Sequence, residues 1–138
     1  IIFIVSISFA FKMGQRSPIY VTGTVVLDQN LKEDTEGVKT VFIILYDDSI
    51  NKRMPYGVVK YGYEEFLASN ELRFIITPDN VQQMFPGKVI PKNFRIKVRF
   101  DKDGFGGPDK DGDLVGQIQD IAYGSKDIKI TVDRKIVF

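Results

Sequence analysis

The sequence contains no cysteine and no histidine. Without cysteine, the chain can form no disulfide, thiolate metal site, cysteine nucleophile or covalent haem-attachment motif. Without histidine, it lacks the commonest general base and the commonest transition-metal ligand. A serine triad is excluded too, because no histidine is present to activate Ser49, Ser69 or Ser125. These absences predict a protein that is not an enzyme and has no copper or zinc site.

The sequence also lacks tryptophan and any strong net charge. Its 19 basic and 18 acidic residues give a formal charge of +1, which offers no basis for binding nucleic acid. With 138 residues, the chain is long enough for one domain with a buried core. Eleven phenylalanines and six tyrosines suit a core that is rich in β-structure.

The most hydrophobic run occupies residues 1–11 and is followed by Lys12 and Arg16. The run is too short to span a bilayer by itself, since a spanning helix needs about 20 residues. We interpret residues 1–14 as the end of a membrane anchor or signal-anchor. A retained signal peptide and a hydrophobic first strand are the alternatives. A short polar linker at 15–18 and one β domain at 19–138 complete the predicted organisation.

From residue 19 onward, strand-like segments recur at short intervals, and no long segment has a helical period. Residues 39–47 are apolar on both faces, which is typical of a central strand. Residues 93–101 alternate apolar and basic side chains, as a half-buried strand does. One helical turn is expected at 64–70, and a short helix or turn at 78–85. The predicted fold is an all-β antiparallel β-sandwich, immunoglobulin-like or cupredoxin-like. Its seven strands are expected at 19–27, 39–47, 56–63, 71–77, 93–101, 113–123 and 127–137.

An acidic, glycine-rich loop separates the fifth and sixth predicted strands. Asp109, Asp111 and Asp113 stand at positions 1, 3 and 5 of a calcium-binding loop, and Asp120 stands at position 12. Oxygen ligands at this spacing suit Ca²⁺. Leu114, however, occupies the position where such a loop requires glycine. Two interpretations therefore stay open: a weak calcium site formed by these four aspartates, and a solvated hairpin loop whose Asp and Gly residues make tight turns.

A basic stripe lies beside this loop on the strand predicted at 93–101. Arg95, Lys97 and Arg99 alternate with apolar residues, so they share one face of the strand. Such a stripe is typical of the solvated face of a sheet, and it also suits an acidic partner surface. The partner-binding residues predicted on this basis are Arg95, Lys97, Arg99, Asp101, Asp103 and Phe105.

Several short motifs follow one another in a definite order along residues 23–132. They are Gly-Thr-Val-Val-Leu-Asp at 23–28, an apolar strand at 40–46, Met-Pro at 54–55 before Val58 and Val59, Met-Phe-Pro-Gly at 84–87, a strand end at 98–104, Gly-Asp-Leu at 112–114 and an apolar strand at 128–132. In this order they resemble the C-terminal periplasmic domain of the c-type cytochrome biogenesis proteins of the CcmI/CycH family.

The resemblance implies a non-enzymatic protein-binding module without a cofactor, membrane-anchored with its domain on the periplasmic side. Family members carry this domain beside helical repeats that bind apocytochrome c, and such repeats are not found between the anchor-like segment and the β domain here. The expected partners are apocytochrome c or subunits of a membrane cytochrome complex. A structural accessory subunit of a respiratory membrane complex is the main alternative, and a calcium-binding β module is the other.

Overall fold

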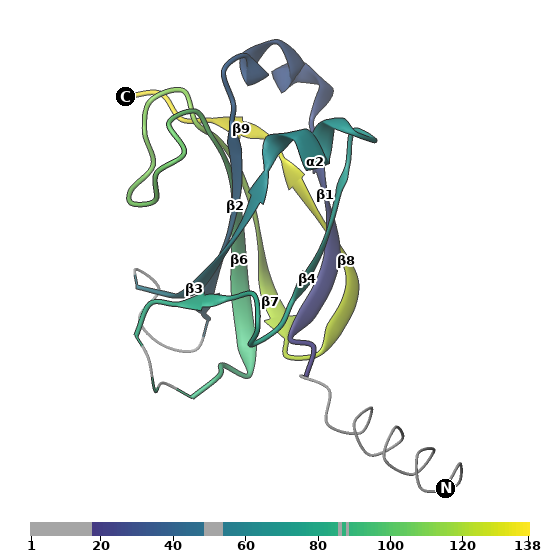
Figure 1. Ribbon diagram of the computed structural model, residues 1–138, viewed down its shortest axis with the longest axis vertical. Helices are drawn as coiled ribbons and strands as arrows, with labels where there is room; N and C mark the ends of the chain where they lie inside the picture. The colour runs from purple at the N-terminus through teal and green to yellow at the C-terminus, as the bar shows by residue number, and fades with distance from the viewer. Residues whose placement is uncertain (1–17, 49–53, 86, 88) are drawn as a thin grey trace, which may run out of the picture.

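The computed structural model describes residues 18–48, 54–85, 87 and 89–138, which form two facing β-sheets (Figure 1). The smaller sheet has the order β4–β1–β8, made by β4 (Leu72–Ile76), β1 (Val21–Leu27) and β8 (Ser125–Val132). The larger sheet has the order β5–β3–β2–β6–β7–β9, made by β5 (Gln82–Gln83), β3 (Pro55–Gly62), β2 (Thr40–Asp47), β6 (Asn93–Asp101), β7 (Leu114–Ala122) and β9 (Arg134–Lys135). A 3₁₀ helix, η1 (Gln29–Thr35), and a short helix, α2 (Tyr63–Leu67), complete the fold. The predicted all-β class is confirmed.

The centre of the larger sheet is formed by β2 and β6, which pair with each other in antiparallel register. The first six residues of β2 are all buried, as expected for a strand with apolar side chains on both faces. On β6, every second residue is fully buried, and these residues are Phe94, Ile96, Val98 and Phe100. The alternation in the sequence therefore predicted the inward face of β6 correctly.

One hydrophobic core fills the space between the two sheets. The larger sheet contributes residues such as Ile43, and the smaller sheet contributes residues such as Ile76; both are fully buried. At one end of the core, Tyr63 and Phe66 of α2 pack against Phe100, with ring centroids 5.5 and 5.1 Å apart. The helix thereby closes this end of the core.

Strand pairing differs from the prediction in two places. The strand expected at 127–137 is divided into β8 and β9, because the chain leaves the smaller sheet and joins the larger one at Asp133, whose N–H donates to the carbonyl of Val115 at 3.1 Å. β8 also pairs with β1 in parallel, whereas the other pairs of described strands are antiparallel. The segment expected to be a helix or turn at 78–85 includes the two-residue strand β5, which pairs with β3.

The anchor predicted at residues 1–14 lies outside the described residues, as does most of the linker predicted at 15–18. In the part of the chain that the structure describes, no helix has both the length and the apolar character needed to cross a membrane.

β7 and β8 approach each other very closely at Gly116. A Cβ atom at this position would lie 1.9 Å from the carbonyl oxygen of Thr131, which is backbone and cannot move aside. Only glycine therefore permits this approach of the two strands, where the chain passes from one sheet to the other.

We predict that Gly116→Ala lowers the free energy of unfolding by about 3 kcal/mol, because the added methyl group forces the two strands apart. Urea unfolding of the wild type and the variant measures the loss. Gly106→Ala is the matched control: no atom lies within 4 Å of the added Cβ, so we expect a change below about 0.5 kcal/mol. Equal stability of the two variants would show that the close approach at Gly116 does not constrain the fold.

Candidate functional site

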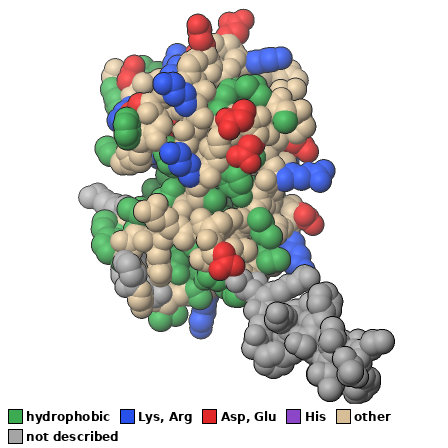
Figure 2. Space-filling model, in the orientation of Figure 1, with side chains coloured by type: hydrophobic (Ala, Val, Ile, Leu, Met, Phe, Trp, Pro, Cys, Tyr) green, Lys and Arg blue, Asp and Glu red, His purple; other side chains and the backbone are tan. Residues whose placement is uncertain are grey.

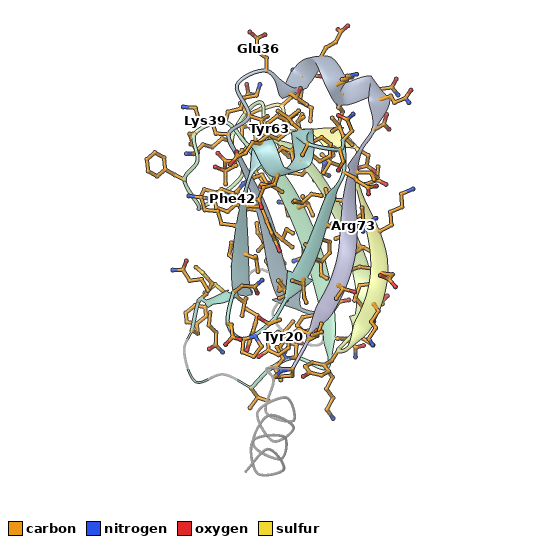
Figure 3. The ribbon with its side chains drawn as sticks, turned by 45° about the vertical axis from the view of Figure 1, so that its right-hand side comes forward. Tyr20, Glu36, Lys39, Phe42, Tyr63 and Arg73 are labelled. Atoms are coloured by element: carbon orange, nitrogen blue, oxygen red, sulfur yellow. The ribbon has the colours of Figure 1, made fainter. Side chains whose placement is uncertain are left out.

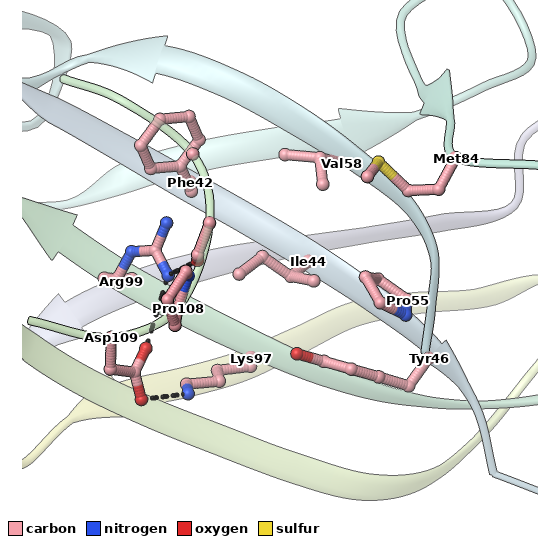
Figure 4. A pocket seen from close by; sticks show the side chains of 12 residues that line it. Phe42, Ile44, Tyr46, Pro55, Val58, Met84, Lys97, Arg99, Pro108 and Asp109 are labelled. Carbon is pink, nitrogen blue, oxygen red and sulfur yellow. Dashed lines mark hydrogen bonds and ion pairs between the residues drawn. The ribbon is translucent and has the colours of Figure 1, made fainter. Parts of the chain in front are cut away.

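A groove of about 380 Å³ lies on the outer face of the larger sheet (Figure 4). Three outward side chains of β2 line it, namely Phe42, Ile44 and Tyr46. One side is formed by residues of β3 and by the residue after β5, and the other by β6 and the loop that follows it. The remaining lining residues are Pro55, Val58, Met84, Lys97, Arg99, Gly106, Gly107, Pro108 and Asp109.

The floor of this groove follows from the sequence of β2. Its inward residues join the core, and its outward residues are apolar as well. Phe42 and Ile44 are only 5% and 6% exposed although they face away from the core. The Arg99 guanidinium lies 5.1 Å from the centroid of the Phe42 ring, and residues 106–109 of the loop between β6 and β7 line the same groove. We call this loop, residues 102–113, the acidic loop.

The side chain of Arg99 holds the acidic loop in this position. It is 3% exposed, and its Nε atom donates to Asp101 Oδ2 at 3.1 Å. Its Nη1 atom donates to the carbonyl oxygen of Gly107 at 2.8 Å and to Asp109 Oδ1 at 3.3 Å. Asp113 Oδ2 lies 3.9 Å from Nε. One guanidinium therefore contacts the residue before the loop, its middle and its last residue.

Further polar contacts reinforce this arrangement. Lys97 Nζ donates to Asp109 Oδ2 at 2.5 Å, so this carboxylate bridges two cations of β6. Asp101 Oδ1 accepts from the backbone N–H groups of Asp103 and Gly104 at 2.9 and 3.0 Å, which fixes the turn that begins the loop. Lys110 forms an ion pair with Asp103 on the solvent side. The acidic loop is therefore tied to the sheet and to itself.

The electrostatic environment differs among the aspartates of this cluster. Burial raises the pKa of Asp109, but the hydrogen bonds and charges of Lys97 and then Arg99 outweigh it, so the pKa lies below its ordinary value. Burial, followed by a side-chain hydrogen bond with Asp103, raises the pKa of Asp101. The same hydrogen bond, followed by that with Lys110, lowers the pKa of Asp103.

The four aspartates predicted as calcium ligands do not converge. Asp109 and Asp113 face Arg99, whereas Asp111 Oδ1 accepts from the backbone N–H of Phe138 at 2.9 Å. Asp120 lies on β7, and its N–H donates to Asp48 Oδ2 at 3.0 Å. Among residues 18–48, 54–85, 87 and 89–138, no three acidic side chains lie where they could hold a metal ion together.

The predicted partner-binding residues are brought into one region, but they are not equally accessible. Arg99 and Asp101 are buried and paired with each other, and Lys97 is mostly covered. Phe105, by contrast, lies in the acidic loop and is 72% exposed. The guanidinium of Arg95 lies 3.9 Å from the ring centroid of Tyr46, beside the groove. Within the basic stripe, Lys97 and Arg99 therefore pair with the acidic loop, whereas Arg95 contacts Tyr46 and Gln117.

The sequence reasoning did not identify the apolar lining of the groove, namely Phe42, Ile44, Tyr46, Val58 and Met84. The available signal was the run of apolar side chains on both faces of β2. Such a run indicates a central strand, and it also predicts a covered outer face.

The groove combines an apolar floor with charged groups at one side. Asp109 forms ion pairs with both Lys97 and Arg99, and Arg99 also faces Asp101 and Asp113. Burial raises the pKa of Tyr46, so its phenol stays neutral near pH 7. Comparison of the chain with protein-family models, curated proteins and solved structures gives no match. The site is therefore interpreted from its own geometry.

We predict that Arg99→Met lowers the free energy of unfolding by about 3–5 kcal/mol, because buried Asp101 and Asp113 lose their cation. Urea unfolding at neutral pH measures the effect. Arg95→Met is the control: Arg95 stacks on Tyr46 at the groove margin, and its loss should cost at most about 1 kcal/mol. Similar losses in the two variants would contradict the central role of Arg99.

A second prediction concerns pH. Asp109→Asn should be less stable than the wild type by about 1–2 kcal/mol near neutral pH, because Lys97 and Arg99 lose a charged acceptor. The folded-state pKa of Asp109 is lower than its ordinary value of 3.8. Its contribution is therefore present above that value and is lost as the pH falls through the folded-state pKa. The difference between variant and wild type should accordingly be largest near neutral pH and should shrink as the pH falls below 3.8.

Urea unfolding at several pH values measures this difference. Glu33 is exposed, so the control variant Glu33→Gln should have the same free energy of unfolding as the wild type at each pH. A difference that stays constant over the whole range would mean that Asp109 acts through packing and not through its charge.

Proposed function

We propose that this chain is a non-enzymatic, membrane-tethered protein-binding domain that acts on the periplasmic side, in c-type cytochrome maturation or in the assembly of a cytochrome-containing complex. We further propose that its two sheets form an immunoglobulin-like or cupredoxin-like sandwich. The biological setting is supported by the ordered motifs along residues 23–132. The binding role is supported by one structural observation, the apolar groove on the outer face of the larger sheet.

The lining of the groove favours an apolar segment of a protein as its occupant. Phe42 and Ile44 form an apolar floor, and the charges at the rim are already satisfied within the chain. A charged ligand would have to break these ion pairs, whereas an apolar side chain gains from leaving water. Met84, 47% exposed at the groove wall, supplies a flexible thioether that adapts to different apolar shapes.

The same features argue for retention of a partner and against its chemical conversion. The sequence has no histidine or cysteine to act as base or nucleophile. Asp109, Lys97 and Arg99 at the groove are held in ion pairs with one another. These pairs keep the groups charged and occupy them, so that they are not available for proton transfer. A domain of this kind serves to hold a protein segment, and apocytochrome c is the partner that the motif order favours. The alternative role, a structural accessory subunit of a respiratory membrane complex, uses the same surface for permanent contact.

We predict that Val58→Glu weakens binding of apocytochrome c by at least about tenfold, which corresponds to about 1.4 kcal/mol. A carboxylate in the apolar groove has to be desolvated when the partner binds. The measurement is the fluorescence anisotropy of a labelled c-type apocytochrome, titrated with the full chain in detergent micelles. Ile75→Glu is the matched control, since Ile75 is exposed on β4 in the other sheet and should leave the affinity unchanged.

Thermal unfolding of both variants confirms that they are folded before their affinities are compared. Equal affinities of the two variants would contradict the groove as the binding site. Absence of apocytochrome binding by the wild type, together with stoichiometric recovery of the chain in a cytochrome complex, would instead assign the role of accessory subunit.

A further inference from the structure

One end of the molecule carries several exposed hydrophobic side chains. It is the end at which the described chain begins, at the bottom of Figure 1, where the β7–β8 turn and the segment after β5 also lie. Ile19, Phe85 and Tyr123 are each between about a third and a half exposed, and Val89 is 87% exposed. We call these four residues the apolar end. Hydrophobic side chains are also visible over the lower half of the face in Figure 2.

Contacts between segments far apart in the sequence hold this end together. The ring centroids of Tyr20 and Tyr123 are 5.5 Å apart, and Figure 3 shows Tyr20 next to the start of the described chain. The carbonyl of Tyr20 accepts from the N–H of Gly124 at 2.7 Å, and the N–H of Tyr123 donates to the carbonyl of Lys92 at 2.8 Å. These contacts fix the start of the described chain, the β7–β8 turn and the residue before β6 next to one another at this end.

The length of chain between residues 1–11 and this surface limits how far apart the two can lie. Seven residues, 12–18, separate that hydrophobic run from Ile19. Even fully extended, they reach at most about 25 Å. A nine-residue strand such as β6 is itself about 30 Å long. If residues 1–11 lie in a bilayer, the apolar end is therefore held near the membrane, and the opposite end, with the acidic loop, is held away from it.

The chemistry of the apolar end suits the interfacial layer of a bilayer. Tyrosine is favoured there, because its ring is apolar and its hydroxyl is polar. Charges of both signs surround the end, among them Lys92, Lys126, Asp79 and Asp127, so attraction to anionic lipid is not the basis of the contact. A few exposed apolar side chains bind a bilayer weakly by themselves. A tether raises their effective concentration at the surface and makes the contact persistent.

We propose that the apolar end rests in the interfacial layer of the phospholipid bilayer and thereby orients the domain. This inference rests on the membrane tether of the proposed function. In this orientation the lower end of the groove, at Met84, opens near the membrane surface, and Phe105 of the acidic loop projects into the aqueous phase.

The absence of tryptophan allows a direct test with single-tryptophan reporters in the full chain. Tyr123→Trp reports on the apolar end, and Phe105→Trp is its matched control, also an exposed aromatic residue but at the opposite end. Each variant is reconstituted in phosphatidylcholine vesicles with and without brominated acyl chains, which quench only fluorophores that enter the lipid. We expect at least about twofold quenching of Tyr123→Trp and no significant quenching of Phe105→Trp.

Phe85→Trp is a second reporter and should behave like Tyr123→Trp, which covers the case of one variant that does not fold. Extraction of the same vesicles with alkaline carbonate distinguishes failure of the membrane tether from failure of the contact between the apolar end and the bilayer. Release of the chain would overturn the tether and this inference with it. Retention of the chain with no quenching at either Tyr123→Trp or Phe85→Trp, or with equal quenching at Phe105→Trp, would overturn the inference alone.

Discussion

The buried guanidinium of Arg99 determines what the outer face of the larger sheet becomes. A side chain that is 3% exposed and contacts three carboxylates and one carbonyl cannot be lost without leaving charges unpaired in a region that excludes water. Its contacts hold the acidic loop at the side of the groove, where residues 106–109 line it together with Phe42 and Ile44 of β2. The groove is therefore a product of electrostatics as much as of hydrophobic patterning.

Much of the fold could be predicted from side-chain alternation. In a strand, every second side chain points to the same face, so the apolar positions identify the face that packs against the core. Phe94 to Phe100 on β6 and the apolar run of β2 are examples. The same pattern does not reveal which strand becomes the neighbour. The parallel pairing of β8 with β1 joins residues about a hundred positions apart, as in Gly23 with Ile128, and depends on the chain changing sheets at Asp133. No local signal in the sequence encodes that change.

The site was predicted less well than the fold, for a related reason. Aspartates at regular spacing, such as Asp109 and Asp113, suggest ligands for a cation, and the structure does place cations beside them. These cations are Lys97 and Arg99 of the chain itself, brought there by the fold-back of the acidic loop. The sequence also places the two sets of charges in neighbouring segments, but spacing alone cannot distinguish a metal ion from an internal guanidinium.

The position of β1 in the smaller sheet has a consequence for how the protein is made. β1 is the first long strand and lies between β4 and β8, of which β8 is the last long strand. The smaller sheet therefore cannot be completed until β8 has been synthesised. Until then the inward face of β1 lacks its full cover, and strand pairings over such long separations in sequence form slowly. The pairing of β8 with β1 is therefore the step that closes this side of the core.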